Sequence, residues 1–352
     1  MSPKASLLLA LLVPGPVQAG EALIGDRGRA ALAPVGPPGL GLAAADCAEC
    51  HEKAAAQWAG SRHAVAGTNP VFWEAWTRFP LGWCVNCHAP LAEGQRATLG
   101  GVARPGALLT PAPPAGAWND GVSCTVCHVR DGAILSARPS SDAAEAAHPT
   151  VHEPALGTVA ACEGCHDFPF QRHDAPRGEL WLSDQPSQAT VAEWATSTAA
   201  AEGRACQACH MGAEGHRFPG AHAPDLVRGA LQVQVGPDGA FTLRAPDAAH
   251  RIPTGDPFRR LVLQTCVDPA CGEPVDQVVL RRSFARDDRT WVEVADRTVP
   301  PQTPTSPAVR ELRLDVAGAT WWRLRYHLAD PRHEPHLPPE QAGYTVHEGP
   351  LP

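Results

Sequence analysis

The sequence has no long apolar segment and no excess of positive charge. No run along its 352 residues reaches the roughly 18 apolar side chains that a membrane-spanning helix needs. Its formal net charge is −8, which gives no electrostatic signature of nucleic-acid binding. We therefore expect a mature protein without a stable membrane span and without a nucleic-acid partner.

Cysteine, by contrast, is abundant, and ten of the twelve cysteines fall in one short pattern. The pattern Cys-x-x-Cys-His occurs five times, at Cys47–His51, Cys84–His88, Cys124–His128, Cys162–His166 and Cys206–His210. Two thiols at this spacing add across the two vinyl groups of one haem, and the following imidazole then lies under the iron as its proximal ligand. Each copy therefore predicts one covalently attached haem c.

These five motifs predict five haems and a full set of attachment residues. The predicted attachment residues are Cys47, Cys50, Cys84, Cys87, Cys124, Cys127, Cys162, Cys165, Cys206 and Cys209, and the predicted proximal iron ligands are His51, His88, His128, His166 and His210. Zinc is the main alternative, but zinc sites do not require histidine directly after every second cysteine. A thioredoxin-like redox pair fits less well, since that motif occurs once and on a βαβ background.

The N-terminal segment has the features of a secretory signal. Lys4 precedes an apolar run over residues 5–13, and Val17-Gln18-Ala19 forms a small-residue cleavage site. We predict a signal peptide over residues 1–19, cleaved after Ala19, with an uncleaved anchor as the alternative. Export fits the motifs, because haem c is attached outside the bacterial inner membrane. The protein is expected to be periplasmic or otherwise exported.

Composition and motif spacing divide the rest of the chain into three parts. Residues 20–45 are rich in Ala, Gly and Pro without a sustained period, and are predicted to form a flexible linker. Residues 46–228 carry the motifs, which recur about every 40 residues, so each unit is expected to combine one haem with a short helix and a loop. In this pentahaem cytochrome c domain, the porphyrins and a tryptophan-rich wall are expected to supply much of the core.

Residues 229–352 change to alternating apolar and polar positions separated by turn signals. The segment "LQVQVGPDGAFTLRA" is typical of a hairpin, and further runs predict an antiparallel sandwich of about seven strands. Cys266 and Cys271, which lie outside the haem motifs, are expected to form a local disulfide in an oxidising compartment. The predicted fold class is α+β: a mostly helical and loop-rich multihaem domain followed by a β-sandwich-like domain that braces it or docks a partner.

Methionine is too scarce to complete the iron coordination. The mature chain contains only Met211, which is adjacent to His210 and badly placed to reach the other face of that haem. We therefore predict bis-His ligation and low potentials, because a methionine ligand raises the potential relative to histidine. The helix-forming run "EKAAAQW" places His63 about 18 Å from His51, whereas two ligands of one iron lie within about 4 Å of each other. His63 is therefore predicted to serve a neighbouring haem.

Eleven histidines remain as candidates for the distal iron positions. An isolated histidine is more often structural, but five irons without partners favour ligation. The predicted distal ligands are His63, His148, His216, His222 and His250. His152 remains an alternative to His148, and His173 an alternative to His250. The late histidines His327, His333, His336 and His347 are expected at the surface.

The motifs and their flanking segments resemble the multihaem c-type cytochromes grouped with cytochrome c-554. The resemblance covers the chain from Asp46 to about Phe258 and rests on "CAECHEKAAAQWAGSRHA", "GVSCTVCH", "QATVAEW" before "CQACHM", "HRFPGAH" and "HRIPTGDPFR". It implies a periplasmic electron carrier with stacked haem pairs, mostly bis-His and sometimes with one five-coordinate haem. His63 matches a distal ligand that this family supplies after its first motif. The best-known member has four motifs, and the strand-rich tail is additional.

Electron transfer is the leading functional hypothesis, because closely packed haems let electrons hop along the chain without any substrate. The expected partners are redox proteins, and since haem propionates add negative charge, these partners are expected to present a basic face. No catalytic residue is predicted. A third class, a docking subunit whose haems connect a larger complex, shares every sequence feature with the carrier.

The main alternative is an oxidoreductase that acts on a small nitrogen or sulfur oxyanion at an open haem. Arg251 or Arg259 would then lie near the substrate, although pairing with haem propionates explains them more simply. Two observations count against a nitrite-reductase or hydroxylamine-oxidase type. The sequence has no Cys-x-x-Cys-Lys variant, and its two tyrosines, Tyr326 and Tyr344, are far from the motifs along the chain.

Overall fold

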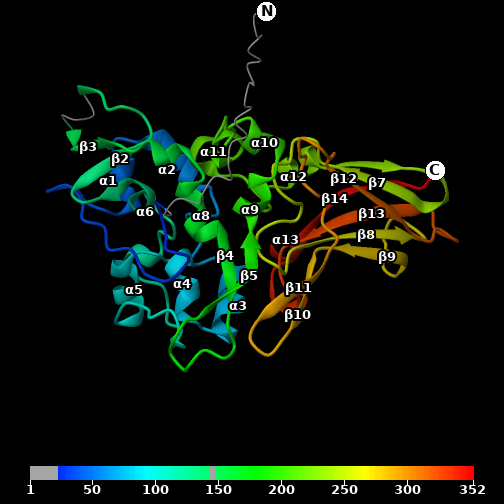
Figure 1. Cartoon of the computed structure of the whole chain (residues 1–352), viewed down its shortest axis with the longest axis horizontal. Coiled ribbons are helices and arrows are strands. Elements are labelled where there is room, and N and C mark those ends of the chain that lie inside the picture. Colours follow the sequence, from blue (N-terminus) through cyan, green and yellow to red (C-terminus); the bar gives the residue numbers. More distant parts are fainter. Residues whose placement is uncertain (1–22, 143–146) are drawn as a thin grey trace, which may run out of the picture.

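The computed structural model describes residues 23–142 and 147–352. The predicted signal peptide and its cleavage site lie outside the described residues. Figure 1 shows two halves: helices and loops, blue to green, fill one side, and most of the long strands, yellow-green to red, fill the other. No helix within the described residues is long and apolar enough to cross a membrane.

The motif-bearing half is built from short helices joined by loops. Its α-helices are α1 (Ala44–Ala48), α2 (Glu52–Ala59), α3 (Pro70–Arg78), α4 (Gly82–His88), α5 (Ala92–Leu99), α6 (Cys124–His128), α8 (Ala160–His166), α9 (Thr190–Ala195), α10 (Thr198–Ala201), α11 (Cys206–His210) and α12 (Pro224–Ala230). Single 3-10 turns are η1 (Gly116–Trp118), η2 (Pro154–Gly157) and η3 (Gly215–Arg217). Two small sheets, which the sequence did not predict, are formed by β1 (Val129–Arg130), β2 (Ala133–Ser136) and β3 (Thr150–His152), and by β4 (Asp167–Gln171) and β5 (Leu182–Ala189).

Local capping explains where α3 begins and how it packs. The Asn69 side chain accepts a hydrogen bond from Phe72 N at 2.9 Å, and Pro70 occupies the first helical position, where no N–H is needed. Phe72 and Trp76 are buried on one face of the helix. Trp76 packs against Trp118 with ring centroids 5.8 Å apart, so α3 and η1 share an aromatic core.

The strand-rich half contains two antiparallel sheets and a separate hairpin. One sheet has the order β12–β7–β6, from β6 (Gln232–Val235), β7 (Ala240–Arg244) and β12 (Val309–Arg313). The other has the order β14–β13–β8–β9, from β8 (Arg260–Cys266), β9 (Pro274–Leu280), β13 (Trp321–His327) and β14 (Gly343–Pro350). The hairpin pairs β10 (Arg282–Arg286) with β11 (Trp291–Asp296). Short helical segments are η4 (Pro237–Gly239), η5 (Glu334–His336) and α13 (Pro339–Ala342).

The two sheets of this half enclose one hydrophobic core. Burial alternates along β7 and β13, as expected when each strand turns one face inward. Phe241 of β7 meets Trp322 of β13 edge-on with ring centroids 5.9 Å apart, and Leu263 and Leu324 are fully buried beside them. The α+β class predicted from the sequence is confirmed.

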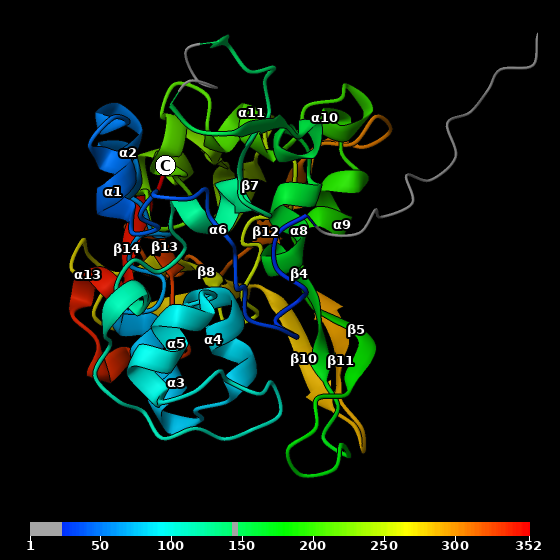
Figure 2. The same ribbon diagram turned by 90° about the vertical axis from the view of Figure 1, so that its left-hand side faces the viewer.

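Two hairpins join the halves, as Figure 2 shows where β4 and β5 lie beside β10 and β11. The buried Arg282 guanidinium donates to the Ser187 and Pro186 carbonyls at 2.9 and 2.6 Å. Phe170 and Phe284 meet edge-on at 4.9 Å. A buried charged group is stable only when it is hydrogen-bonded. Because its two acceptors lie on β5, Arg282 of β10 holds the two hairpins together.

The segment predicted as a flexible linker is, over residues 23–45, packed against the motif-bearing half. Ile24 is 4% exposed and joins a small core with Val126. Leu32 N donates to Pro90 O at 2.7 Å. The linker prediction is therefore wrong for these residues. The irregular composition gave no sign that a few apolar side chains of this segment are buried. It also gave no sign that its backbone groups pair with distant loops.

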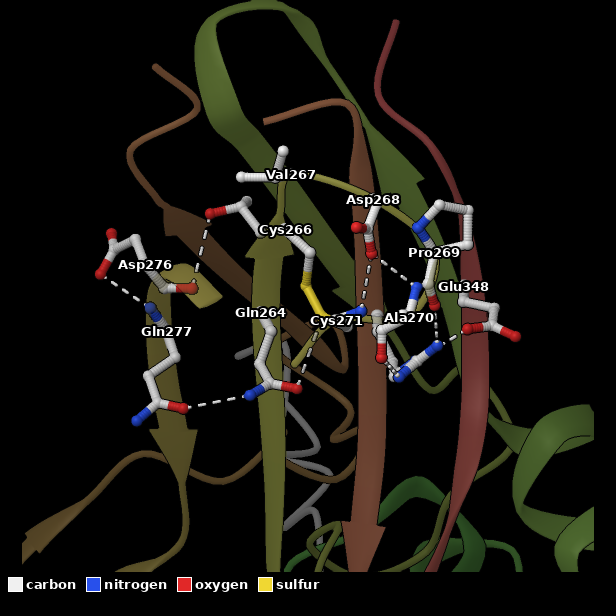
Figure 3. Close-up of a disulfide and its surroundings, with 12 residues drawn as sticks. Gln264, Cys266, Val267, Asp268, Pro269, Ala270, Cys271, Asp276, Gln277 and Glu348 are labelled. Atoms are coloured by element: carbon white, nitrogen blue, oxygen red, sulfur yellow. Dashed lines mark hydrogen bonds and ion pairs between the residues drawn. A yellow bond between two sulfur atoms is a disulfide. The ribbon is translucent and has the colours of Figure 1, made fainter. Parts of the chain in front are cut away.

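The predicted disulfide between Cys266 and Cys271 is present at the end of β8 (Figure 3). The two Cα atoms are 5.2 Å apart, a normal separation for a bridged pair. Asp268 accepts hydrogen bonds from Ala270 N and Cys271 N at 2.8 and 3.3 Å. These bonds shape the turn that brings the thiols together, and the prediction is confirmed.

Candidate haem sites

Each Cys-x-x-Cys-His motif lies on a helical turn. Four motifs end the helices α4, α6, α8 and α11, and the first follows α1, where His51 N donates to Cys47 O at 3.0 Å. Residues three and four positions apart lie on the same side of a helix. Two thiols and one imidazole are thus presented together, as attachment of one haem requires. The ten motif cysteines, all within the described residues, form no disulfide.

Four of the five motif histidines face a second imidazole from a distant part of the chain. The ring centroids are 6.4 Å apart for His51 and His148, 6.2 Å for His166 and His63, 6.3 Å for His128 and His216, and 6.1 Å for His210 and His250. The four separations are nearly equal, although the second histidine of each pair comes from a different segment of the chain. A common object between the rings would account for this.

The separation fits an iron atom between the two imidazoles. Iron–nitrogen bonds of about 2 Å put the ring nitrogens about 4 Å apart, and about 1 Å from each nitrogen to its ring centre gives about 6 Å between centroids. A direct N–H···N hydrogen bond, with about 3 Å between the nitrogens, would bring the centroids to about 5 Å. The observed 6.1 to 6.4 Å is too wide for that bond and matches a ligated iron.

Backbone carbonyls orient several of these imidazoles. Nδ1 hydrogen bonds join His88 to Ala66 O at 3.0 Å, His128 to Leu135 O at 2.9 Å, His210 to Pro219 O at 2.6 Å and His250 to Arg251 O at 3.0 Å. A carbonyl oxygen only accepts, so these rings carry their proton on Nδ1. Nε2 is then free to bind a metal, as is usual for histidine ligands.

His63 is held in a turn after α2 by the segment that precedes the third motif. Trp58 Nε1 donates to Val122 O at 2.8 Å, and Val122 N donates to His63 O at 2.9 Å. Gly121 has a φ of 55° and lies directly against the His63 carbonyl, so only glycine fits there. His63 is thereby turned toward His166 of the fourth motif, which is the geometry that its predicted role requires.

Burial keeps this facing pair uncharged. It lowers the pKa of His63 to about 4 and that of His166 to about 3, with smaller contributions from His210 to both shifts. Both rings are therefore neutral at pH 7. The neutral imidazole is the form that binds metals.

His88 differs from the other motif histidines, because no second imidazole faces it. All sixteen histidines of the sequence lie within the described residues, and none contacts the His88 ring. This ring stacks instead on Phe72, with centroids 4.0 Å apart and planes 10° from parallel. Burial lowers the pKa of His88, while the Ala66 carbonyl and the Asp256 carboxylate oppose the shift.

The structure does not bring His222 to any motif histidine. His222 lies in the loop between η3 and α12, where burial, Arg62 and Arg259 lower its pKa to about 3. His222 is near His216 in sequence, but the loop turns the two rings to different neighbours. The ligand role of His222 therefore stays a prediction that none of the facing pairs supports, and His88 is left without a facing imidazole.

The two alternative histidines also lie apart from the motif histidines. His152 is exposed on β3. His173 accepts a hydrogen bond from Arg286 Nε at 3.1 Å and meets Trp291 edge-on at 5.9 Å. The geometry thus favours His148 over His152 and His250 over His173.

Three of the four late histidines, which were expected at the surface, are partly exposed and contact other groups. His327 Nδ1 lies 3.0 Å from Glu334 Oε1, and His333 Nδ1 lies 3.6 Å from Glu74 Oε1 on α3. His347 Nε2 is 2.7 Å from Leu231 O. The contacts of His333 and His347 form where the strand-rich half packs against α3 and the end of α12, which the sequence pattern did not indicate. His336 is exposed, as expected.

Cysteines of different motifs interact with one another, which orders the motifs in space. Cys47 interacts with Cys124, Cys87 with Cys165, and Cys162 with Cys206. Cys165 also acts on Cys127, whose pKa is raised mainly by burial. The motifs therefore form a series in the order first, third, fourth and fifth, and the second motif joins at the fourth.

The first motif opens to the surface. A depression of about 510 Å³ is lined by Cys50, His51, Glu52, Lys53, Ala54 and Gln57. Cys50 and, at the other end of the series, Cys209 are exposed, whereas the other motif cysteines are only partly accessible. The first-motif end of the series is thus accessible to a large partner.

Sequence distance was misleading for Tyr326. This tyrosine is 2% exposed on β13, and burial raises its pKa to about 12. The charges of Arg259 and Asp256 act on its hydroxyl, and Asp256 also acts on Cys84 and His88 of the second motif. Asp256 thus acts both on Tyr326 and on the second motif, which the position of Tyr326 along the chain did not indicate.

The fold resembles that of a known multihaem protein. The crystal structure of a penta-heme cytochrome c552 from Thermochromatium tepidum matches 87% of this chain and 97% of its own chain, with a TM-score of 0.60 and 22% sequence identity. The chain has the fold of a pentahaem cytochrome. No family model and no curated protein matches the sequence. The resemblance to cytochrome c-554 therefore stays a prediction.

Proposed function

We propose that this protein is an exported pentahaem c-type cytochrome that transfers electrons through closely spaced haems. The observation that carries the proposal is the set of four facing histidine pairs, each at the separation that an iron requires. The motif thiols would hold haem c, which supplies the redox-active iron. The fold shared with a penta-heme cytochrome supports the same conclusion.

The facing pairs supply the proposed second ligands. His148 serves the haem at Cys47 and Cys50, His216 the haem at Cys124 and Cys127, His63 the haem at Cys162 and Cys165, and His250 the haem at Cys206 and Cys209. The haem at Cys84 and Cys87 keeps His88 alone. Bis-His ligation at four irons favours low potentials, since histidine lowers the potential relative to methionine.

The spatial order of the motifs supports a path for electrons. Electrostatic influences between motif cysteines link the first, third, fourth and fifth motifs in series. The accessible first motif is the proposed point of exchange with a redox partner. Because the chain has a net charge of −8 before any propionates are added, we expect that partner to be basic at its docking face.

One observation favours a second candidate function, reduction or oxidation of a small nitrogen or sulfur oxyanion. His88 has no facing imidazole, so the iron of the haem it holds would have a free position. An open iron is required for substrate binding and is unnecessary for electron transfer alone. The remaining four haems would then deliver electrons to that iron.

The test is an electron paramagnetic resonance spectrum of the oxidised, haem-loaded protein, with total haem measured as the pyridine haemochrome. We expect five haems per chain, low-spin signals from four irons, and one high-spin signal that potassium cyanide converts to low-spin. Fewer than five haems, or no bis-His low-spin signals, would refute the cytochrome proposal. Five low-spin irons that do not react with cyanide would rule out an open iron, and electron transfer alone would remain as the proposed function. Nitrite turnover assays with a reduced dye decide the enzymatic candidate.

A further inference from the structure

The ring of Phe218 contacts two histidines that belong to different facing pairs. Its centroid lies 4.6 Å from that of His63, with the ring planes 59° apart, and 5.9 Å from that of His216, with the planes 89° apart. Aromatic rings attract each other at such distances when they are tilted or edge-on. His63 faces His166, and His216 faces His128. One side chain therefore packs against the proposed second ligands of two haems.

The backbone of Phe218 adopts a conformation that is unfavourable for a bulky residue. It ends the turn η3 with a φ of 46° and a ψ of 56°, in the left-handed region. Glycine reaches this region without strain, whereas bulky side chains rarely occupy it. Phe218 is the only aromatic residue with a positive φ in the described part of the chain. Strained residues cluster at functional sites, where the position of a side chain matters. The contacts of the ring therefore account for phenylalanine here better than the turn does.

Contacts on the N-terminal side of Phe218 hold this turn in place. Gly215 has a φ of 55°, and a side chain on it would collide with the Gln57 amide of α2, so only glycine fits there. His216 N donates a hydrogen bond to Gln57 Oε1 at 3.3 Å. The turn η3 is thus fixed against α2, the helix that precedes His63 along the chain. The same contacts therefore hold the Phe218 ring and the two histidines in one arrangement.

The residue after Phe218 reaches a third haem site. His210 Nδ1 donates to Pro219 O at 2.6 Å, and His210 is the proposed proximal ligand of the fifth haem. Between His216 and Pro219 the chain thus contacts proposed ligands of the third, fourth and fifth haems. Removing the Phe218 ring should act on the two imidazoles that it touches and spare the fifth haem, because Pro219 contacts His210 only through its backbone.

We propose that Phe218 is a positioning residue that orients His63 and His216 together and thereby sets the ligand geometry of the third and fourth haems. The proposal rests on the proposed function, because both histidines must bind iron. The facing planes are 48° apart for His63 and His166, and 45° apart for His216 and His128. Contacts that fix the orientation of a histidine ligand tune the metal that it holds. In a low-spin ferric haem, the angle between the two imidazole planes influences the g values.

The experiment compares the haem-loaded parent with variants of Phe218 by electron paramagnetic resonance and redox titration. Phe218→Ala removes the ring, and Phe218→Tyr retains it. Phe284→Ala is the matched control, since Phe284 is also half-buried and its ring contacts, among the described residues, are with Phe170 and Arg282. His63→Ala and His216→Ala each remove one low-spin signal and so assign the signals of the fourth and third haems. Haem content and the four low-spin signals of the parent are measured first, and their absence would refute the proposed function itself.

With the parent signals in place, we expect F218A to change the g values and potentials of the third and fourth haems and to leave the other two low-spin signals unchanged. F218Y and F284A should both resemble the parent. If F218A loads too little haem, Phe218→Gly takes its place, because glycine removes the ring and relaxes the strained backbone. A spectrum of F218A or F218G that matches that of F284A, or changes that spare the third and fourth haems, would show that the ring only fills space.

Discussion

The imidazole of His63 faces that of His166, with ring centroids 6.2 Å apart, although His63 follows the first motif and His166 belongs to the fourth. The same crossing recurs elsewhere: His148 follows the third motif and faces His51 of the first, and His216 follows the fifth and faces His128 of the third. Each proposed haem thus joins two remote segments. Haem attachment is therefore expected to be coupled to folding, as metal binding is in other small metalloproteins.

Replacing His63 should open one further iron. In His63→Ala the haem at Cys162 and Cys165 loses its proposed second ligand, so one of the low-spin signals should be replaced by a high-spin signal. The matched control is His152→Ala, since His152 is exposed and faces no motif histidine. Electron paramagnetic resonance of both oxidised variants checks this. A spectrum of H63A identical to that of H152A would contradict the pairing of His63 with the fourth haem.

Glu193 is predicted to position His250. The buried Glu193 carboxylate accepts hydrogen bonds from Arg251 N at 3.1 Å and from Thr254 Oγ1 at 2.6 Å. Both donors belong to the segment that directly follows His250. Glu193→Ala removes this acceptor from two partly buried donors, which should cost about 1–3 kcal/mol. It should also raise the high-spin fraction of the haem at Cys206 and Cys209.

Glu193→Gln keeps an acceptor oxygen and separates positioning from charge. The low-spin spectrum should be largely restored in this variant, while denaturant titration reports the stability of both. If E193A loses stability but every iron stays low-spin, Glu193 stabilises the fold without positioning His250.

Gly121 is expected to tolerate no side chain. Its φ of 55° favours glycine, and it lies against the backbone at His63. Gly121→Ala should destabilise the protein by about 1–3 kcal/mol through backbone strain and should shift the spectrum of the haem that His63 serves. Gly100→Ala is the control, since Gly100 also has a positive φ, of 73°, but has open space around it. Equal spectra for the two variants would show that Gly121 does not hold His63 in place.

The disulfide is expected to stabilise the strand-rich half without affecting the haems. Closing the short loop between Cys266 and Cys271 should contribute about 2 kcal/mol through the reduced entropy of the unfolded chain. The double substitution Cys266→Ser and Cys271→Ser should lower the urea midpoint accordingly, and haem content should stay at the parent value. A loss of haem in this variant would mean that the disulfide also supports the motif-bearing half.

The sequence by itself determined the local chemistry. Cysteines three residues apart with histidine next in line share one side of a helical turn wherever they occur, so each motif could be identified without a fold. The alternation of residues along β7 and β13 likewise predicted strands, because period-two burial is a local property. The disulfide between Cys266 and Cys271 is also local, since the two cysteines are only five positions apart in sequence.

Only the tertiary structure decided which histidines meet. His216 and His222 are near neighbours in sequence, yet His216 faces His128, whereas burial and the charges of Arg62 and Arg259 lower the pKa of His222. His250, which faces His210, comes from the part of the chain predicted as a separate β-rich domain. A facing pair depends on where two remote loops are held, and that is set by packing among segments far apart in sequence. For the same reason the sequence did not show that no second imidazole faces His88.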